Sequence, residues 1–336
     1  MNDQTKVDDA RRVAFLLVNE FSLISFATGL DPLRIANRLL GKRVYDYKVY
    51  SLDGESISSS GGISISVDGG LDDLRRLSRS FDRPEFIFVC SGVNVAHYAQ
   101  DKALLGFVRD ASRSGVKMGG LCTASYILAA AGLLDGRRCA IHWENLAGFS
   151  EKFPKAEVYA DLFEIDRNVY TCAGGTAPLD LMMNIIGEDQ SEQFVNAVCE
   201  QALTDRVRNS QDRQRLPLRA RLGVQNPRIL QVIEIMESNL SEPFSLLEVA
   251  NQIGLSRRQV ERLFRREMGR SPARYYLELR LERARHLLLQ SSLPIVDIAI
   301  ACGFVSASHF SKCYRELYGK SPQVERNSRD TLEPTI

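Results

Sequence analysis

The stretch LPIVDIAIACGFVSASHFSKCYRELYG, residues 293–319, carries the clearest pattern in this 336-residue chain. Apolar positions recur at helical spacing on both sides of Gly303. They are Ile295, Ile298 and Ala299 before the glycine, and Phe310 and Tyr314 after it. Gly303 supplies the positive φ that a tight turn needs, and Phe304 fills the turn. Two helices joined by a short glycine-containing turn predict a helix-turn-helix unit.

A second copy of this plan lies upstream in FSLLEVANQIGLSRRQVERLFRREMG, residues 244–269. Gly254 provides the turn, Leu255 fills it, and Ser256 is a good N-cap for the helix that follows. We expect these apolar side chains to face the core: Leu247, Val249, Ala250 and Ile253 before the turn, and Val260, Leu263, Phe264 and Met268 after it. Residues 271–291 predict one long helix between the copies, and about 20 helical residues span about 30 Å. That length is close to one turn of B-DNA, about 34 Å, so both second helices can enter successive major grooves.

The outward-facing side chains of the two second helices suit contacts to double-stranded DNA. Arg and Gln are the side chains that reach guanine and adenine edges in the major groove. We therefore expect DNA contacts from Arg257, Arg258, Gln259, Glu261, Arg262 and Arg265 in the upstream copy, and from Ser306, Ser308, His309 and Lys312 in the downstream copy.

The charge of the chain is divided in a way that supports a polyanionic partner. From Arg206 to the C-terminus there are 22 Lys and Arg against 14 Asp and Glu, whereas the preceding part has 21 against 28. A basic C-terminal part fits DNA, although a solvated basic surface without a ligand would have the same charge.

These two copies and the helix between them resemble the AraC/XylS family of transcription regulators over about residues 226–326. The run IA…CGF.S.S.FS..Y….G.SP is the family signature that carries the resemblance. The family usually has Tyr-Arg soon after the final Ser-Pro, where this sequence has Val324-Glu325-Arg326. The resemblance implies a DNA-binding regulator, usually an activator, that acts as a homodimer and has RNA polymerase as a partner.

The first part of the chain alternates short apolar runs with helix patterns. VAFLLV at 13–18 and VKMGGL at 116–121 are short, continuous and apolar, as buried strands are. Strands separated by helices predict an α/β fold, a doubly wound, flavodoxin-like and mostly parallel sheet covered on both faces. The polar, Arg-rich residues 204–225 are interpreted as a linker. We therefore expect a ligand-sensing and dimerisation domain at 11–203, this linker, and an all-α DNA-binding domain at 226–326.

Cys122 lies between a predicted strand and a predicted helix in GGLCTASYILAAAGLL. Such a turn exposes the residue at its apex, and a helix N-terminus would stabilise a thiolate there. His142 ends a later strand, so the two residues are a candidate nucleophile pair. The arrangement resembles the PfpI-type branch of the class I glutamine amidotransferase-like superfamily, over about residues 11–200. Its hydrolytic members carry a Glu that is hydrogen-bonded to the Cys; here Ser25 takes that place, and Glu20 lies on the preceding loop.

Two functions follow from this comparison of motifs. Without the orienting Glu, the resemblance implies a sensor whose former active-site cleft binds a small metabolite, with Cys122 and His142 vestigial and no catalytic residue. The alternative is a Cys-dependent hydrolase or amidase that carries a DNA-binding domain. We expect no cofactor and no metal, because the seven cysteines contain no CxxC pair.

The carboxyl ends of parallel strands are the usual ligand site in open α/β sheets. We expect the effector to contact the loops there, through Asn19, Glu20, Phe21, Ser91, Cys122, Thr123, His142, Trp143, Glu144 and Thr176. Trp143 and Phe21 can form an aromatic face for a quaternary ammonium group, with core packing as the alternative for Trp143. Glu20 or Glu144 can pair with an amine. Resemblance to fused regulators of carnitine and glycine betaine catabolism implies such a ligand, and arginine and other amino acids remain open.

The N-terminal sequence MNDQTKVDDARR has no apolar run of signal-peptide type, and no stretch approaches the about 18 apolar residues of a membrane span. We expect a cytoplasmic protein with reduced thiols and no membrane partner.

Overall fold

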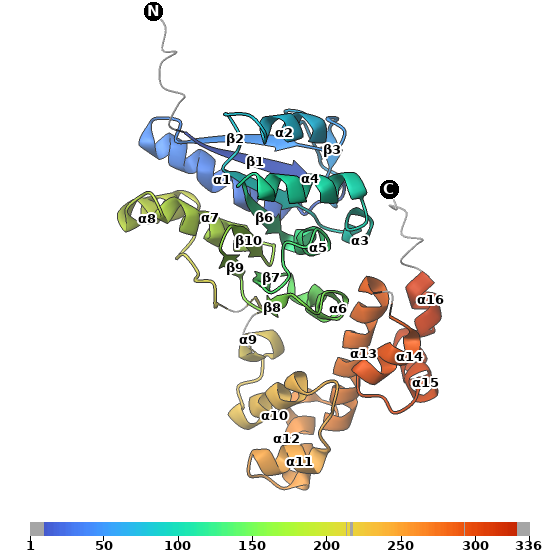
Figure 1. Cartoon of the computed structure of the whole chain (residues 1–336). Helices are drawn as coiled ribbons and strands as arrows, with labels where there is room; N and C mark the ends of the chain where they lie inside the picture. Colours follow the sequence, from blue (N-terminus) through green and yellow to red (C-terminus); the bar gives the residue numbers. More distant parts are fainter. Residues whose placement is uncertain (1–9, 213, 216–217, 292, 328–336) are drawn as a thin grey trace, which may run out of the picture. The chain divides into compact units, whose positions relative to one another are not determined.

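The computed structural model describes residues 10–212, 214–215, 218–291 and 293–327. Its internal contacts divide the chain into two compact units, Met1–Gln214 and Arg215–Ile336. The first unit is an α/β structure and the second is helical, as Figure 1 shows.

A six-stranded sheet in the order β2-β1-β5-β6-β10-β9 forms the centre of the first unit. The strands are β1 (Arg11–Leu17), β2 (Tyr45–Tyr50), β5 (Phe86–Cys90), β6 (Lys117–Leu121), β9 (Phe163–Asp166) and β10 (Val169–Cys172). The first five in that order are parallel, and β9 pairs antiparallel with β10. The central strand β5 is buried along its whole length, which explains its continuous apolar sequence FIFVC.

Helices cover both faces of this sheet, which confirms the predicted doubly wound α/β class. One face packs against α1 (Leu23–Leu40), α7 (Ala177–Gly187) and α8 (Glu192–Gln201). The other packs against α2 (Leu71–Leu77), α4 (Lys102–Arg113) and α5 (Ser125–Ala130). Alternate residues of β1 divide between the two cores, with Phe15 on the first face and Leu16 on the second.

Shorter elements complete the first unit. They are β3 (Ile57–Ser58), β4 (Ser64–Ile65), α3 (Val95–Tyr98), β7 (Arg138–Ala140), α6 (Leu146–Lys152), β8 (Glu157–Tyr159), and the 3₁₀ turns at Cys122–Ala124 and Trp143–Asn145. The α-helix after β6 is therefore shorter than the apolar pattern through Leu134 suggests, because its start is a 3₁₀ turn and Gly132 has a φ of 81°.

The stretch interpreted as a linker, residues 204–225, is divided between the two units instead of standing apart from them. The backbone carbonyl of Ser210 accepts a hydrogen bond from the Leu162 amide at 2.8 Å. Gln214 Nε2 donates to the carbonyls of Ile141 and Asp161 at 3.0 and 2.7 Å. Further on, α9 (Leu218–Leu222) and Val224 pack into the core of the second unit. A polar composition predicts solvent exposure, but these polar groups find specific partners in the fold.

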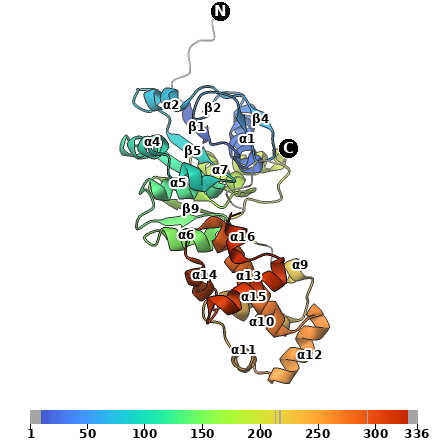
Figure 2. The ribbon, with the colours of Figure 1, turned by 90° about the vertical axis from the view of Figure 1, so that its right-hand side faces the viewer.

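In the described part of the second unit, seven further helices follow, seen from another side in Figure 2. They are α10 (Pro227–Ser238), α11 (Leu246–Gln252), α12 (Arg257–Met268), α13 (Pro272–Gln290), α14 (Ile295–Ala301), α15 (Ala307–Tyr318) and α16 (Pro322–Asn327). Serine side chains cap the starts of α11, α12, α13 and α15. Both predicted helix-turn-helix units are present, as α11–α12 and α14–α15, and α13 is the predicted long helix between them.

One apolar position in the first of these units was assigned to the wrong face. Leu247 is 57% exposed, whereas Leu246 packs against the core. Val249 and Ala250 are buried as expected, and a helix places Leu246 on their face because residues three and four apart are neighbours. Val296, at the equivalent position of α14, is exposed as well.

Candidate functional site

The outer face of α12 presents a row of arginines. Arg258, Arg262 and Arg265 are exposed and, together with Glu261 and Arg266, line one surface depression. The opposite face of the helix is anchored by the buried side chains of Val260 and Phe264. The guanidinium forks therefore point away from the core, where they can meet phosphates or guanine edges.

Two of the expected DNA contacts on α12 have other partners. Gln259 Oε1 accepts hydrogen bonds from the amide and hydroxyl of Ser256, at 2.8 and 2.9 Å, in a capping box. Arg257 Nε donates to Glu261 Oε1 at 2.9 Å. Of the expected contacts on this helix, Arg258, Arg262 and Arg265 therefore have the fewest hydrogen bonds and ion pairs within the protein.

The second unit's other reading helix, α15, has a different chemistry. Ser306 accepts from the His309 amide at 3.2 Å and so serves as the N-cap, while Ser308, His309 and Lys312 are exposed. His309 Nε2 lies 3.3 Å from Cys313 Sγ on the next turn. Lys312 is the one cation of the expected set on α15, so this helix presents much less positive charge than α12.

Arginines from outside the two motifs hold their turns in place. Arg228 of α10 donates from Nη1 to the Ile253 carbonyl at 2.9 Å. Arg280 of α13 donates to the carbonyls of Cys302 and Gly303, at 2.8 and 2.7 Å, and its guanidinium carbon lies 4.2 Å from the Phe304 ring centroid. Sequence reasoning missed both, since a helical arginine carries no local signal of a distant carbonyl.

In the first unit, Cys122 lies directly after β6 with a φ of 63°, at a tight strand-to-helix turn. Gly174 packs directly against it, because a Cβ on that glycine would approach Cys122 Sγ to 2.8 Å. On the other side, the Thr123 hydroxyl donates to the Gly92 carbonyl at 2.7 Å. The strand-end loops thus close tightly around this residue.

The electrostatics at Cys122 oppose nucleophilic chemistry. Burial raises the pKa of the Cys122 thiol to about 11, and hydrogen bonds from the Thr123 backbone and the Ser25 hydroxyl lower it only partly. Loss of solvation thus opposes the thiolate that a helix N-terminus would stabilise. The Ser25 hydroxyl also hydrogen-bonds to Ser22 Oγ at 2.9 Å.

The structure separates the expected ligand contacts into exposed and buried groups. Asn94 Nδ2 donates to the Glu20 carboxylate, a partner that sequence reasoning missed. The rings of His142 and Trp143 lie 5.6 Å apart, and His142 Nδ1 accepts from the Glu144 amide at 3.4 Å. Asn19 and Glu144 are exposed, and Cys122, Glu20, His142 and Trp143 are partly exposed.

Phe21 and Ser91 are buried and do not lie on the loop surface where ligand contacts are expected. Phe21 is fully buried, with its ring edge-on to Phe26 at 5.7 Å, so the proposed aromatic face of Phe21 and Trp143 does not form. The backbone of Phe21 bridges to Ser59 and Gly92, which holds the residue against the core. Ser91 is also fully buried, and Thr123 nearly so.

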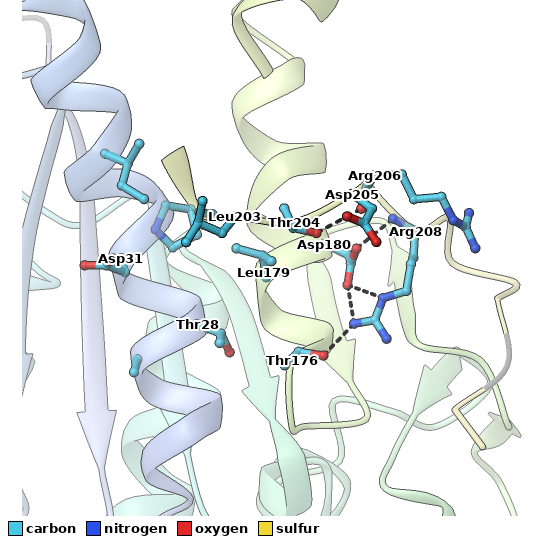
Figure 3. Close-up of a pocket in the computed structure, with 14 residues that line it drawn as sticks. Thr28, Asp31, Thr176, Leu179, Asp180, Leu203, Thr204, Asp205, Arg206 and Arg208 are labelled. Atoms are coloured by element: carbon cyan, nitrogen blue, oxygen red, sulfur yellow. Dashed lines mark hydrogen bonds and ion pairs between the residues drawn. The ribbon is translucent and has the colours of Figure 1, made fainter. Parts of the chain in front are cut away.

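Thr176 belongs to a separate pocket of about 680 Å³, drawn in Figure 3. The pocket lies between α1, α7 and the chain that follows α8. Its lining residues are Ala27, Thr28, Asp31, Pro32, Ile35, Thr176, Leu179, Asp180, Ala202, Leu203, Thr204, Asp205, Arg206 and Arg208. Its size is typical of sites for small molecules.

The fold and these surfaces define a class of protein, in which an α/β unit with a cysteine at a strand-to-helix turn is joined to a double helix-turn-helix unit for DNA. Comparison with known proteins agrees. The DJ-1/PfpI family model matches residues 11–188, and a helix-turn-helix domain model matches residues 249–328. The chain belongs to the AraC family of helix-turn-helix transcription regulators that carry an N-terminal DJ-1/PfpI domain.

Its relatives are similar over nearly their full lengths. The HTH-type transcriptional regulator GbdR of Pseudomonas aeruginosa (strain UCBPP-PA14) is 42% identical, over 96% of this chain and 86% of the relative. The regulator CdhR of P. aeruginosa PAO1 is 41% identical, over 93% and 90%. A crystal structure of an AraC family transcriptional regulator from Pseudomonas putida has a TM-score of 0.50 at 26% identity, covering 57% of this chain and 99% of that chain.

These full-length relatives are transcription regulators and not enzymes, so the hydrolase alternative is not supported. The protein is a DNA-binding transcription regulator. None of the described helices is both long and apolar enough to cross a membrane.

Proposed function

We propose that this regulator activates a catabolic operon when a small amine or amino-acid-like metabolite, such as carnitine or glycine betaine, binds its N-terminal unit. The observation that supports this proposal is Trp143, which is half-buried at the loop edge of the sheet, with its ring 5.6 Å from that of His142 and the exposed Glu144 next to it in the sequence. An indole face attracts a quaternary ammonium group, and a carboxylate nearby adds to that attraction.

The site as now proposed consists of Asn19, Glu20, Cys122, His142, Trp143 and Glu144, with Thr123 packed behind Cys122. Cys122 serves as a wall of the site and not as a nucleophile, which agrees with the raised pKa of its thiol. Arginine and other amino acids are competing ligands, since each also carries a positively charged nitrogen group.

The operator is contacted by Arg258, Arg262 and Arg265 of α12 and by Ser308, His309 and Lys312 of α15. We further propose that two copies bind together and that the DNA-bound dimer contacts RNA polymerase. Operators with two-fold symmetry are bound by proteins with two-fold symmetry, which supports a dimer. The ligand can shift the dimer between two states only by as much as its affinities for those states differ.

The experiment is isothermal titration of the full chain with glycine betaine, carnitine and arginine. We expect one of the quaternary amines to bind, and Trp143→Ala to weaken that binding about 30-fold, since a desolvated cation–π contact contributes about 2 kcal/mol. Phe81→Ala is the control, because Phe81 is a fully exposed aromatic residue of the same unit. Equal binding by the Trp143→Ala variant would mean that the effector binds at another part of the unit. Binding of arginine alone would mean that the effector is arginine and not a quaternary amine.

A further inference from the structure

The pocket beside Thr176 is distinct from the loop edge around Trp143. One wall is formed by α1, through Ala27, Pro32 and Ile35, and the opposite wall by Leu179 of α7 (Figure 3). The third side is the chain after α8, from Ala202 to Arg208. These last residues lead directly to the second unit, which begins at Arg215.

The charged groups of the pocket are almost all neutralised by neighbours. Asp180 is buried and accepts hydrogen bonds from the Arg208 amide, Nε and Nη2, at 2.7, 3.0 and 2.6 Å. Arg206 pairs with Asp212 at 3.0 Å, and Asp31 pairs with Arg34 at 2.6 Å.

Asp205 differs from the other charged lining residues. Within the part of the chain that the structure describes, it is the one ionisable residue of the pocket wall with no hydrogen bond or ion pair. Leu203 is 92% exposed, so a large apolar side chain stands at the pocket mouth. Its φ of 53° belongs to the C-terminal turn of α8, where the Thr204 amide donates to the Cys199 carbonyl at 3.1 Å.

We propose that this pocket binds a primary alkylammonium compound, whose ammonium group donates to Asp205 and whose apolar part packs against Leu179, Ile35 and Leu203. A negative charge without a partner beside an apolar wall favours a cation with an apolar body. Among the described residues, none of those lining the pocket is aromatic, so a quaternary ammonium group would have neither a cation–π partner nor an N–H to donate. The ligand class therefore differs from the one proposed for the loop edge.

Occupation of the pocket acts on the connection to the DNA-binding unit. A ligand on Asp205 orders the backbone of residues 203–208, and the following residues are already fixed at Ser210 and Gln214. The change in the free energy of DNA binding that the ligand causes equals the coupling free energy between the pocket and the DNA-binding surface.

The test compares n-butylammonium with n-butyltrimethylammonium on the full chain, two probes that share an apolar body and differ in N–H donors. Binding is measured by saturation-transfer NMR and by thermal shift. We expect n-butylammonium to bind at least about tenfold more tightly than its trimethyl analogue, and Asp205→Asn to remove that difference, because a charge-assisted hydrogen bond is lost. Glu200→Gln, an exposed carboxylate on α8 outside the pocket, should bind like the wild type.

Hydrogen exchange of residues 203–212 supplies the second readout. With n-butylammonium, exchange there should slow in the wild type and in Glu200→Gln but not in Asp205→Asn. Equal affinity for the two probes, no binding of n-butylammonium, or an unchanged affinity in Asp205→Asn would overturn the proposal. So would a lower association state of Asp205→Asn in light scattering, since the face would then be a contact between copies. Glycine betaine binding and DNA binding are measured separately, so these outcomes leave the function proposed above unaffected.

Discussion

Arg208 donates three hydrogen bonds to Asp180, through its backbone amide, Nε and Nη2, and so fastens the chain after α8 to the first turn of α7. The Asp180 side chain is 3% exposed, whereas that of Arg208 is 32% exposed. The pair is therefore asymmetric, because Asp180 depends on Arg208 for its charge compensation while Arg208 can still reach water.

Arg208→Ala should destabilise the N-terminal unit by about 3 kcal/mol, because it leaves a buried carboxylate without its partner. The measurement is urea denaturation, with the unfolding of each unit followed separately. Arg206→Ala is the matched control. Its exposed ion pair with Asp212 should contribute less than about 1 kcal/mol. Equal losses in the two variants would contradict the assigned role of Asp180 burial.

Arg258→Ala should reduce binding to a selected operator about 5- to 100-fold while changing binding to random DNA little, because a bidentate guanine contact contributes about 1–3 kcal/mol of discrimination. Operators are selected from a random library and affinities are measured at fixed salt. Arg219→Ala, an exposed arginine of α9, should leave both affinities nearly unchanged. An equal loss on both DNAs in Arg258→Ala would reassign this arginine to a phosphate contact.

Alkylation of Cys122 should be slow at neutral pH and accelerate only toward pH 11, because burial raises the pKa of its thiol to about 11. The rate is followed by peptide mass spectrometry after iodoacetamide pulses. Cys122→Ser should retain ligand-dependent regulation. Fast alkylation near pH 7 would contradict the raised pKa of this thiol.

The burial of two other cysteines, Cys139 and Cys172, links their ionisation to the stability of the N-terminal unit. The pKa values of Cys139 and Cys172 are raised to about 12, chiefly by burial. A group whose pKa is higher in the folded than in the unfolded chain stabilises the fold below its unfolded value, here about 9, and loses that contribution as the pH rises through the folded value. The N-terminal unit should therefore lose stability steadily between about pH 9 and 12. Denaturation curves across this range test the trend, and constant stability would contradict it.

Gly303→Ala should cost more stability than Gly254→Ala, although both glycines occupy the turn of a helix-turn-helix unit with φ values of 73° and 67°. Each alanine meets the left-handed backbone penalty of about 1–2 kcal/mol. A Cβ at Gly303 would in addition approach Pro243 Cδ to 2.6 Å and the Leu240 carbonyl to 2.9 Å, whereas nothing lies within 4 Å at Gly254. Urea denaturation followed by the helical signal compares the two. Equal losses of stability in the two variants would mean that Pro243 shifts to make room for the new Cβ.

The loop edge of the first unit shows where reasoning from the sequence stops. The strand ends, and hence the place of Cys122, follow from short apolar runs, because a buried strand needs them. The orientation of Phe21 does not, because its burial depends on backbone bridges to Ser59 and Gly92 from distant parts of the chain. Thr176 likewise follows a predicted strand, yet its hydroxyl accepts from Arg208, which the sequence placed in a linker.

By itself the sequence determined the two architectures, both helix-turn-helix units and the arginine-rich face of α12, since periodicity, glycine turns and serine caps are local properties. Tertiary structure alone decided which polar groups are free. It assigned Arg280 to the Gly303 turn and Arg208 to Asp180, and it left Asp205 exposed at a pocket. The reason is physical: hydrogen-bond partners far apart in sequence meet only when helices and strands pack, and no local pattern encodes that meeting.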